Sequence, residues 1–362
     1  MSPFAYLKKL DWKLNAAAIL LVMFGLLSLY SSSLGRDDFG NVGKQAVFFA
    51  IGVALMIAVS TLDWRLLKND PYTILFFYAV GIVLLAGIFV FAPQIRGVKT
   101  WYRVWGISID PVEYMKIILI VLMAKFFSMR HIEMYKISHT VLSGFYVGIP
   151  AILILIQPNL GSASILLFLW IILLLVSGVR MRHFFVLLAT GILIASASWS
   201  FVLKDYQKNR ILSFVEPELD PLGIGWSQLQ SKIAIGNGGL FGRGIGQGTQ
   251  TQYGFLSEPQ TDFIFAAIAE EFGTVGLLIL FSLFLILIWR ILRIGLDAES
   301  NFPRIFAAGF ASLLIVEFSI NIGMNIGFLP IVGLPLPFVS YGGSAMVMGF
   351  IGLGILQSIK VH

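Results

Sequence analysis

The chain has 362 residues, of which 58% are hydrophobic and 12% are charged, and its formal net charge is +6. Soluble domains are roughly 45–50% apolar and about 25% charged, so this composition excludes an ordinary soluble enzyme, a disordered chain and a fibrous protein. The sequence has no cysteine, which excludes a disulfide framework, and its basic residues are spread between apolar runs, which argues against a nucleic-acid-binding patch.

Ten apolar runs are long enough to cross a bilayer core, which needs about 20 mostly apolar residues per helix. They cover residues 15–33, 44–62, 72–92, 111–129, 137–156, 161–178, 183–203, 265–289, 305–325 and 343–360. Two of them are ambiguous, because the fourth contains charged side chains and the eighth follows an acidic stretch. We therefore expect an all-α polytopic membrane protein with about ten transmembrane helices, forming a single domain over residues 1–362.

Lysine and arginine are distributed unevenly between the two sides of this arrangement. With the N-terminus in the cytoplasm, ten spans place 13 of these residues in inside segments and 5 in short outer loops. The inverted orientation would reverse that ratio, against the positive-inside rule. We therefore expect both termini in the cytoplasm, with the first run retained as a signal anchor because it follows Lys8, Lys9 and Lys13.

Two segments outside the helical runs have unusual sequences. Residues 204–261 form a long outer loop between the seventh and eighth spans, and its mixture of amphipathic and glycine-rich sequence favours an ordered extracytoplasmic cap. Residues 327–343, before the tenth span, contain Pro330, Pro335 and Pro337, which prevent a regular helix. Irregular backbone at membrane depth needs surrounding protein or a wet cavity. We therefore expect a re-entrant segment beside an outer cavity, with a simple outer loop as the alternative.

Ionisable and amide side chains inside the runs are candidate functional residues, because burying them in a membrane is costly. Glu113 and Lys116 are three residues apart, so they share a helix face within pairing distance. Such a pair can be structural or can prime a charged cavity, and the sequence leaves both open. Glu317, Asn321 and Asn325 form a stripe at intervals of four, which suits interhelical hydrogen bonds as well as it suits substrate binding.

Polar residues also stand at two boundaries between apolar and irregular sequence. Asp262 lies where the cap meets the membrane, and an acid there can act as a general base on a lipid-anchored substrate. The alternative is a helix N-cap. Gly342, Gly343 and Ser344 follow Tyr341 and can offer backbone N–H groups to a phosphate, although this short pattern is weak. No histidine and carboxylate spacing predicts a metal site.

Five segments contain specific sequence motifs in a specific order, which is more informative than composition alone. They are residues 111–116, 157–161, 230–250, 261–273 and 321–344, which include Gln-Ser-Lys-Ile-Ala-Ile-Gly, Thr-Asp-Phe and Pro-Leu-Pro followed by Ser-Tyr-Gly-Gly-Ser. Together they resemble the SEDS family of shape, elongation, division and sporulation proteins over nearly the whole chain. Within the family, the wording favours the elongation branch over the division branch.

The resemblance implies a peptidoglycan glycosyltransferase that joins lipid II into glycan strands at the outer face of the bacterial plasma membrane, during cell elongation and shape maintenance. It implies an α-linked donor and a β-linked product, and therefore an inverting displacement. The implied partners are lipid II, the undecaprenyl-pyrophosphate-linked glycan, a class B penicillin-binding protein of the PBP2 type and other elongasome membrane proteins, with no nucleic acid.

The resemblance also assigns roles to residues. The family's essential aspartate falls on Asp262, as general base, and its buried glutamate and lysine fall on Glu113 and Lys116, as a supporting ion pair. The lipid pyrophosphate needs a positive charge as it leaves, and outer-side cations are candidates: Lys99, Arg210, Lys232 and Arg243. Further substrate-binding candidates are Asn321, Ser340, Tyr341, Gly342, Gly343 and Ser344. No cofactor is assigned, but Mg²⁺ or Mn²⁺ is a candidate to offset the charge of the leaving pyrophosphate.

Some positions depart from the family pattern. Asn159 stands where the family usually has aspartate, so we exclude it as an acid. Gln260 replaces a common histidine, Ser257 replaces a common proline, and Lys99 is alone where two basic residues are usual. A flippase for the lipid-linked precursor and a non-catalytic scaffold for the penicillin-binding protein remain alternatives. Polar motifs concentrate on the outer half, which favours the enzyme over the flippase.

Overall fold

The structure, a computed structural model, describes residues 9–93, 99–104, 106–130, 137–201, 208, 212–214, 216 and 223–362. The helices are α2 (Trp12–Leu34), α3 (Gly40–Thr61), α4 (Arg65–Asn69), α5 (Pro71–Phe91), α6 (Pro111–Arg130), α7 (Ile137–Ile156), α8 (Leu160–Val176), α9 (Met181–Phe201), α11 (Ile224–Gly238), α12 (Thr249–Gln252), α13 (Ile264–Asp297), α14 (Asn301–Ile326) and α15 (Gly343–Val361). Strands β1 (Tyr102–Val104) and β2 (Ile107–Ile109) form an antiparallel pair, with Arg103 opposite Ser108.

Each of the ten apolar runs coincides with one helix, which confirms the all-α polytopic class. Length and composition alone qualify seven helices in the described part of the chain as membrane spans: α2, α3, α5, α7, α13, α14 and α15. Of the other three, α6 carries Glu113, Lys116 and Lys125, α8 has 17 residues, and the described apolar part of α9 ends at Leu193.

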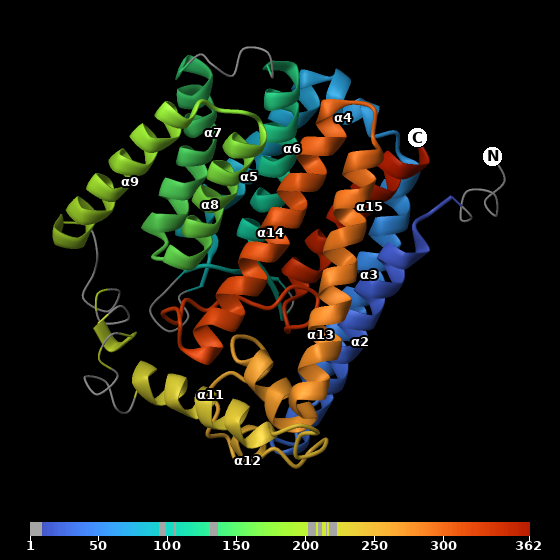
Figure 1. Cartoon of the computed structure of the whole chain (residues 1–362), viewed down its shortest axis with the longest axis vertical. Helices are drawn as coiled ribbons and strands as arrows, with labels where there is room; N and C mark the ends of the chain where they lie inside the picture. Colours follow the sequence, from blue (N-terminus) through green and yellow to red (C-terminus); the bar gives the residue numbers. More distant parts are fainter. Residues whose placement is uncertain are drawn as a thin grey trace.

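The long helices form a bundle, and the cap lies across one end of it. Figure 1 shows α11 and α12 at the end opposite to the C-terminus, with α11 running across the direction of α13. α14 packs against α6, α8, α11 and α13. Its rings Phe302, Phe306 and Phe310 stack along the bundle core. α14 therefore links the cap, the candidate spans and the core.

α13 is broken near its N-terminal end. Gly273 has φ 64° and ψ −162°, a conformation that other residues rarely adopt. Residues 239–244 insert at the break: the Arg243 and Gly244 N–H groups donate to the carbonyls of Glu270 and Glu271, and the Thr274 and Val275 N–H groups donate to the carbonyls of Gly239 and Leu240. The single run expected at 265–289 is thus a short N-terminal arm (264–272), a break and a long leg (274–297).

The opposite end is held by a buried carboxylate. Asp11, 2% exposed, caps the Leu14 N–H at 3.0 Å, pairs with Arg290 of α13 and accepts from Lys360 Nζ of α15 at 2.7 Å. Burial alone would raise the pKa of Asp11, but the hydrogen bonds from Arg290 and Lys360 outweigh it and lower the pKa to about 2. Three helices therefore meet on one ionised side chain.

Asp11→Asn is expected to destabilise the fold by about 2 kcal/mol near neutral pH, because the lowered pKa is a measure of how strongly the fold favours the carboxylate. This contribution is present above about pH 4 and disappears as the pH falls through about 2. Thermal unfolding of the purified variant measures it. Asp63→Asn is the control, because the exposed pair of Asp63 with Arg65 is worth less than about 1 kcal/mol.

Candidate active site at the N-terminal end of α13

Asp262 lies two residues before α13, and its backbone is held by two buried amides. Its carbonyl oxygen accepts from Asn321 Nδ2 at 3.1 Å and from Asn325 Nδ2 at 2.9 Å. Both asparagines are 0% exposed. The N-cap position of α13 is Phe263, so Asp262 is not its N-cap residue. Two side chains of α14 therefore set the position of Asp262 without using its carboxylate.

The proline-rich segment wraps around the same turn. No helix forms between Gly327 and Gly342. Ser340 Oγ donates to the carbonyl of Thr261 at 2.6 Å, and the Tyr341 N–H donates to the carbonyl of Gln260 at 2.8 Å. A Cβ atom built on Gly333, whose φ is 71°, would lie 3.4 Å from Asp262 Oδ2. The segment thus passes close to the carboxylate, which remains partly exposed.

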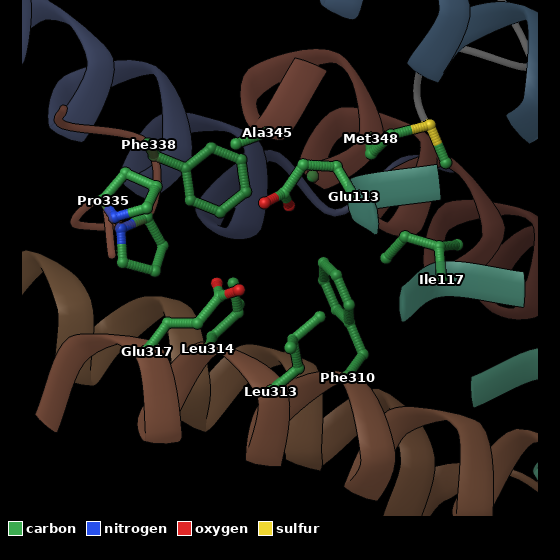
Figure 2. A pocket seen from close by; sticks show the side chains of 12 residues that line it. Glu113, Ile117, Phe310, Leu313, Leu314, Glu317, Pro335, Phe338, Ala345 and Met348 are labelled. Carbon is green, nitrogen blue, oxygen red and sulfur yellow. The ribbon is translucent and has the colours of Figure 1, made fainter. Parts of the chain in front are cut away.

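The Glu113–Lys116 pair has a third member. Lys116 Nζ lies 2.6 Å from Glu113 Oε1 and 2.5 Å from Glu317 Oε1, and Lys116 is 1% exposed. Figure 2 shows both carboxylates at a cavity that Pro335 and Phe338 also line. The cavity volume is about 30 Å³, enough for one or two water molecules. The ion cluster therefore joins α6 to α14 beside the proline-rich segment.

One stripe of α14 connects this ion cluster to Asp262. Glu317 binds Lys116, Asn321 donates to the carbonyls of Asp262 and Leu334, and Asn325 donates to the carbonyls of Asp262 and Asn321. The interval of four residues, already visible in the sequence, keeps all three side chains on one face. The spacing therefore already placed Asn325 on this face, but the sequence could not show that its side chain would bind the backbone carbonyl of Asp262.

Asn325→Leu is expected to destabilise the fold and to displace Asp262. The substitution removes a donor to the Asp262 carbonyl and leaves the Ala266 N–H, which donates to Asn325 Oδ1 at 3.2 Å, without that acceptor. A buried unsatisfied group costs about 1–3 kcal/mol. Thermal unfolding and turnover are measured on the same preparation. Ser312→Ala, which removes only a bond to Ala308 of the same helix, should change neither.

The two acidic residues of the N-terminal arm of α13 accept hydrogen bonds that hold the cap and α2. Glu270, 0% exposed, accepts from the N–H groups of Gln250 and Thr251 at 2.8 and 3.0 Å. Glu271 accepts from Ser31 Oγ at 2.7 Å, which ties the arm to α2. These carboxylates are therefore used within the protein, and sequence reasoning had given them no role.

The remaining candidates lie in different places. Lys99 Nζ donates to the carbonyl of Phe89 at 3.1 Å, Arg243 is exposed with its Nε bonded to the carbonyl of Asn237, and Lys232 extends from α11 towards Gly327. Arg210 lies outside the described residues.

The glycine-rich turn before α15 is partly occupied by contacts within the protein. The Gly342 N–H donates to Gln45 Oε1 at 3.2 Å, Ser344 Oγ accepts from the Asp110 N–H at 2.9 Å, and Gly343 packs against the ring of Phe48. Of the described candidates, Asn321, Ser340 and Tyr341 form hydrogen bonds with residues 260–262. Substrate contacts of the others stay predictions.

Asn159 has a local structural role. Asn159 Oδ1 accepts from the Ser162 N–H at 3.1 Å and so caps α8, a role that needs no charge. Within the described ranges, no three histidine or carboxylate side chains are close enough to hold a metal ion.

The chain is similar to several known proteins along nearly its whole length. Peptidoglycan glycosyltransferase MrdB of Escherichia coli (strain K12) is 36% identical over 365 residues, which cover 98% of this chain and 96% of MrdB. A chain from a structure described as structural coordination of polymerization and crosslinking by a peptidoglycan synthase complex superposes with a TM-score of 0.83 at 29% identity, covering 97% of both chains.

The rod shape determining protein RodA of Thermus thermophilus superposes with a TM-score of 0.72 at 26% identity, covering 97% of this chain and 96% of RodA. The cell cycle protein family of FtsW, RodA and SpoVE matches residues 11–362. The match confirms the resemblance that the sequence motifs indicated. The chain therefore belongs to the FtsW/RodA/SpoVE family of cell cycle proteins.

Proposed function

We propose that the chain is a peptidoglycan glycosyltransferase that polymerises lipid II at the outer face of the bacterial plasma membrane during cell elongation. The observation that carries the proposal is the bracing of Asp262: three side chains from α14 and the proline-rich segment hold the backbone of residues 261–262 and leave the carboxylate partly exposed. The identity to MrdB over 98% of the chain supports the same activity.

In the proposed reaction, Asp262 is the general base. It accepts the proton of the acceptor sugar hydroxyl while that oxygen attacks the anomeric carbon of the donor. The bond from this carbon to the lipid pyrophosphate breaks on the opposite face, so the configuration inverts and no covalent enzyme intermediate forms. The pyrophosphate leaves with the bonding electrons, and Lys232 and Arg243 are candidates to offset its charge. Mg²⁺ or Mn²⁺ would supply additional positive charge.

The topology is proposed on the same basis. All ten helices that match the apolar runs cross the membrane, both termini lie in the cytoplasm, residues 204–261 form the extracytoplasmic cap and residues 327–343 line the outer cavity. The cap helices α11 and α12 lie at the end of the bundle opposite to the C-terminus (Figure 1), which supports placing the cap and the C-terminus on different sides of the membrane. A single domain over residues 1–362 is supported by the family match to residues 11–362.

A class B penicillin-binding protein of the PBP2 type is the proposed transpeptidase partner, within a larger set of elongasome membrane proteins. The similarity to a chain of a peptidoglycan synthase complex supports this partner. The complex would crosslink strands as the proposed enzyme extends them.

The deciding experiment incubates the purified protein with lipid II and with a partner whose transpeptidase is inactivated. A ladder of glycan polymer on a gel is expected, with Asp262→Asn as the negative control. If the wild type makes no polymer with any partner or divalent cation, the proposal is wrong. Movement of labelled lipid II across vesicles without polymer would indicate a flippase.

A further inference from the structure

α11 exposes a stripe of large apolar side chains, which is unusual for a helix in contact with water. Trp226, Leu229 and Ile233 are 38%, 52% and 37% exposed, and their spacing of three and four residues places them on one stripe. Surface helices of soluble proteins turn such a stripe towards the core. The stripe of α11 therefore requires an apolar surrounding outside this chain.

The side of α11 turned away from this stripe packs against the protein. Gln228 and Ser231 are at most 3% exposed, Ser231 Oγ donates to the carbonyl of Asn325 at 2.8 Å, and Ala234, 0% exposed, forms a small apolar cluster against which Ile235 packs. α11 thus contacts the protein through both polar and apolar side chains and leaves the stripe of Trp226, Leu229 and Ile233 outward. Rotating the helix would bury the apolar stripe against the bundle but would break the hydrogen bond from Ser231 to Asn325. Contacts within the protein therefore set the orientation of α11.

A second apolar feature lies at the break in α13. Leu240 and Phe241 are 68% and 81% exposed, and the Val275 N–H donates to the carbonyl of Leu240 at 3.1 Å. This bond places the pair beside the first turn of the long leg, where Val275 and Leu278 are also exposed. Because α13 qualifies as a membrane span, the Leu240–Phe241 tip continues a lipid-facing surface.

Both features fit the outer phospholipid surface. α11 runs across the bundle end rather than along it (Figure 1), and tryptophan is enriched at membrane–water interfaces. The exposed Arg243 follows the Leu240–Phe241 tip by two residues, where its cation can meet a lipid phosphate, whereas the Lys232 side chain lies against Gly327. Interfacial helices combine these properties: an apolar face in the acyl boundary and flanking basic residues.

We propose that α11 and the Leu240–Phe241 tip rest on the outer leaflet as an interfacial anchor whose occupant is phospholipid. The anchor holds the cap at headgroup depth. The hydrogen bond from Ser231 to the carbonyl of Asn325 links the position of α11 to α14, and the Asn325 side chain in turn donates to the carbonyl of Asp262. The anchor does not depend on the proposed glycosyltransferase activity, and its test below measures no turnover.

The absence of native cysteine allows a direct test with nitroxide labels on single cysteines. The full chain, without a partner, is reconstituted in phosphatidylethanolamine and phosphatidylglycerol vesicles. Leu229→Cys, Ile233→Cys and Phe241→Cys are compared with Leu285→Cys, a highly exposed site on the α13 leg, and Glu299→Cys, an exposed loop site. The measured quantity is the collision ratio of oxygen to a water-soluble nickel chelate.

The anchor requires collision ratios several-fold above that of Glu299→Cys and nearer to that of Leu285→Cys. A ratio equal to that of Glu299→Cys shows that the stripe faces water and overturns the proposal. Low collision with both reagents shows that protein, not lipid, covers the stripe and also overturns it. As an independent measurement, brominated lipid should quench wild-type fluorescence more than that of Trp226→Phe; equal quenching contradicts the proposal.

Discussion

Asp262→Asn is expected to lower the rate of lipid II polymerisation by about 10²–10⁴-fold, the usual contribution of a general base. Asparagine has nearly the same shape but cannot accept the hydroxyl proton. The hydrogen bonds from Asn321 and Asn325 reach the backbone carbonyl of residue 262, so the substitution leaves them in place. The rate should therefore fall while the thermal unfolding temperature stays close to that of the wild type.

Glu258→Gln is the matched control, because it neutralises an exposed acid four residues earlier in the same cap. Its expected rate is that of the wild type. Initial rates are measured at saturating lipid II, with gel-filtration profiles to verify folding. A folded Asp262→Asn variant that polymerises at the wild-type rate would show that another group takes the proton.

Lys116→Met is expected to cause the largest loss of stability. It removes the cation between Glu113 and Glu317, whose nearest oxygens lie 2.6 and 2.5 Å from Lys116 Nζ, and leaves two carboxylates around a small cavity. Removing one partner of a buried ion cluster costs about 3–5 kcal/mol. Folded yield and the thermal unfolding temperature of the purified protein measure the loss.

The variant that combines Lys116→Met, Glu113→Gln and Glu317→Gln separates charge from packing. It leaves no unpaired charge, so most of the lost stability should return. Turnover of this variant then reports whether the charged cluster matters beyond folding. If the neutral triple variant is no more stable than Lys116→Met, unpaired carboxylates are not the cause of the loss.

The sequence predicted the features that depend on local pattern. Apolar length located the ten helical runs, and the three prolines predicted the irregular segment before α15. The spacing of Glu317, Asn321 and Asn325 predicted a shared face. Each of these follows from residues within a few turns of one another.

The missed features depend on contacts between distant parts of the chain. Glu317 pairs with a lysine 201 residues earlier, a relation that no local spacing encodes. Asn321 looked equally suited to substrate, but its amide is used by the carbonyls of Asp262 and Leu334. The break at Gly273 was not expected either, because glycine within an apolar run is compatible with a helix until another segment takes over its hydrogen bonds.

The insertion of residues 239–244 into α13 determines how this protein can be divided for engineering. Four backbone hydrogen bonds join the inserted segment to both sides of the break. In a chimera that exchanges only the loop, residues 239–244 of another protein would therefore have to form these hydrogen bonds with the unchanged α13. An exchangeable module must include residues 270–275 together with the loop. For the same reason, a mechanical force applied to the cap acts directly on α13. The far part of α13 is linked to Asp11 by the ion pair of Arg290.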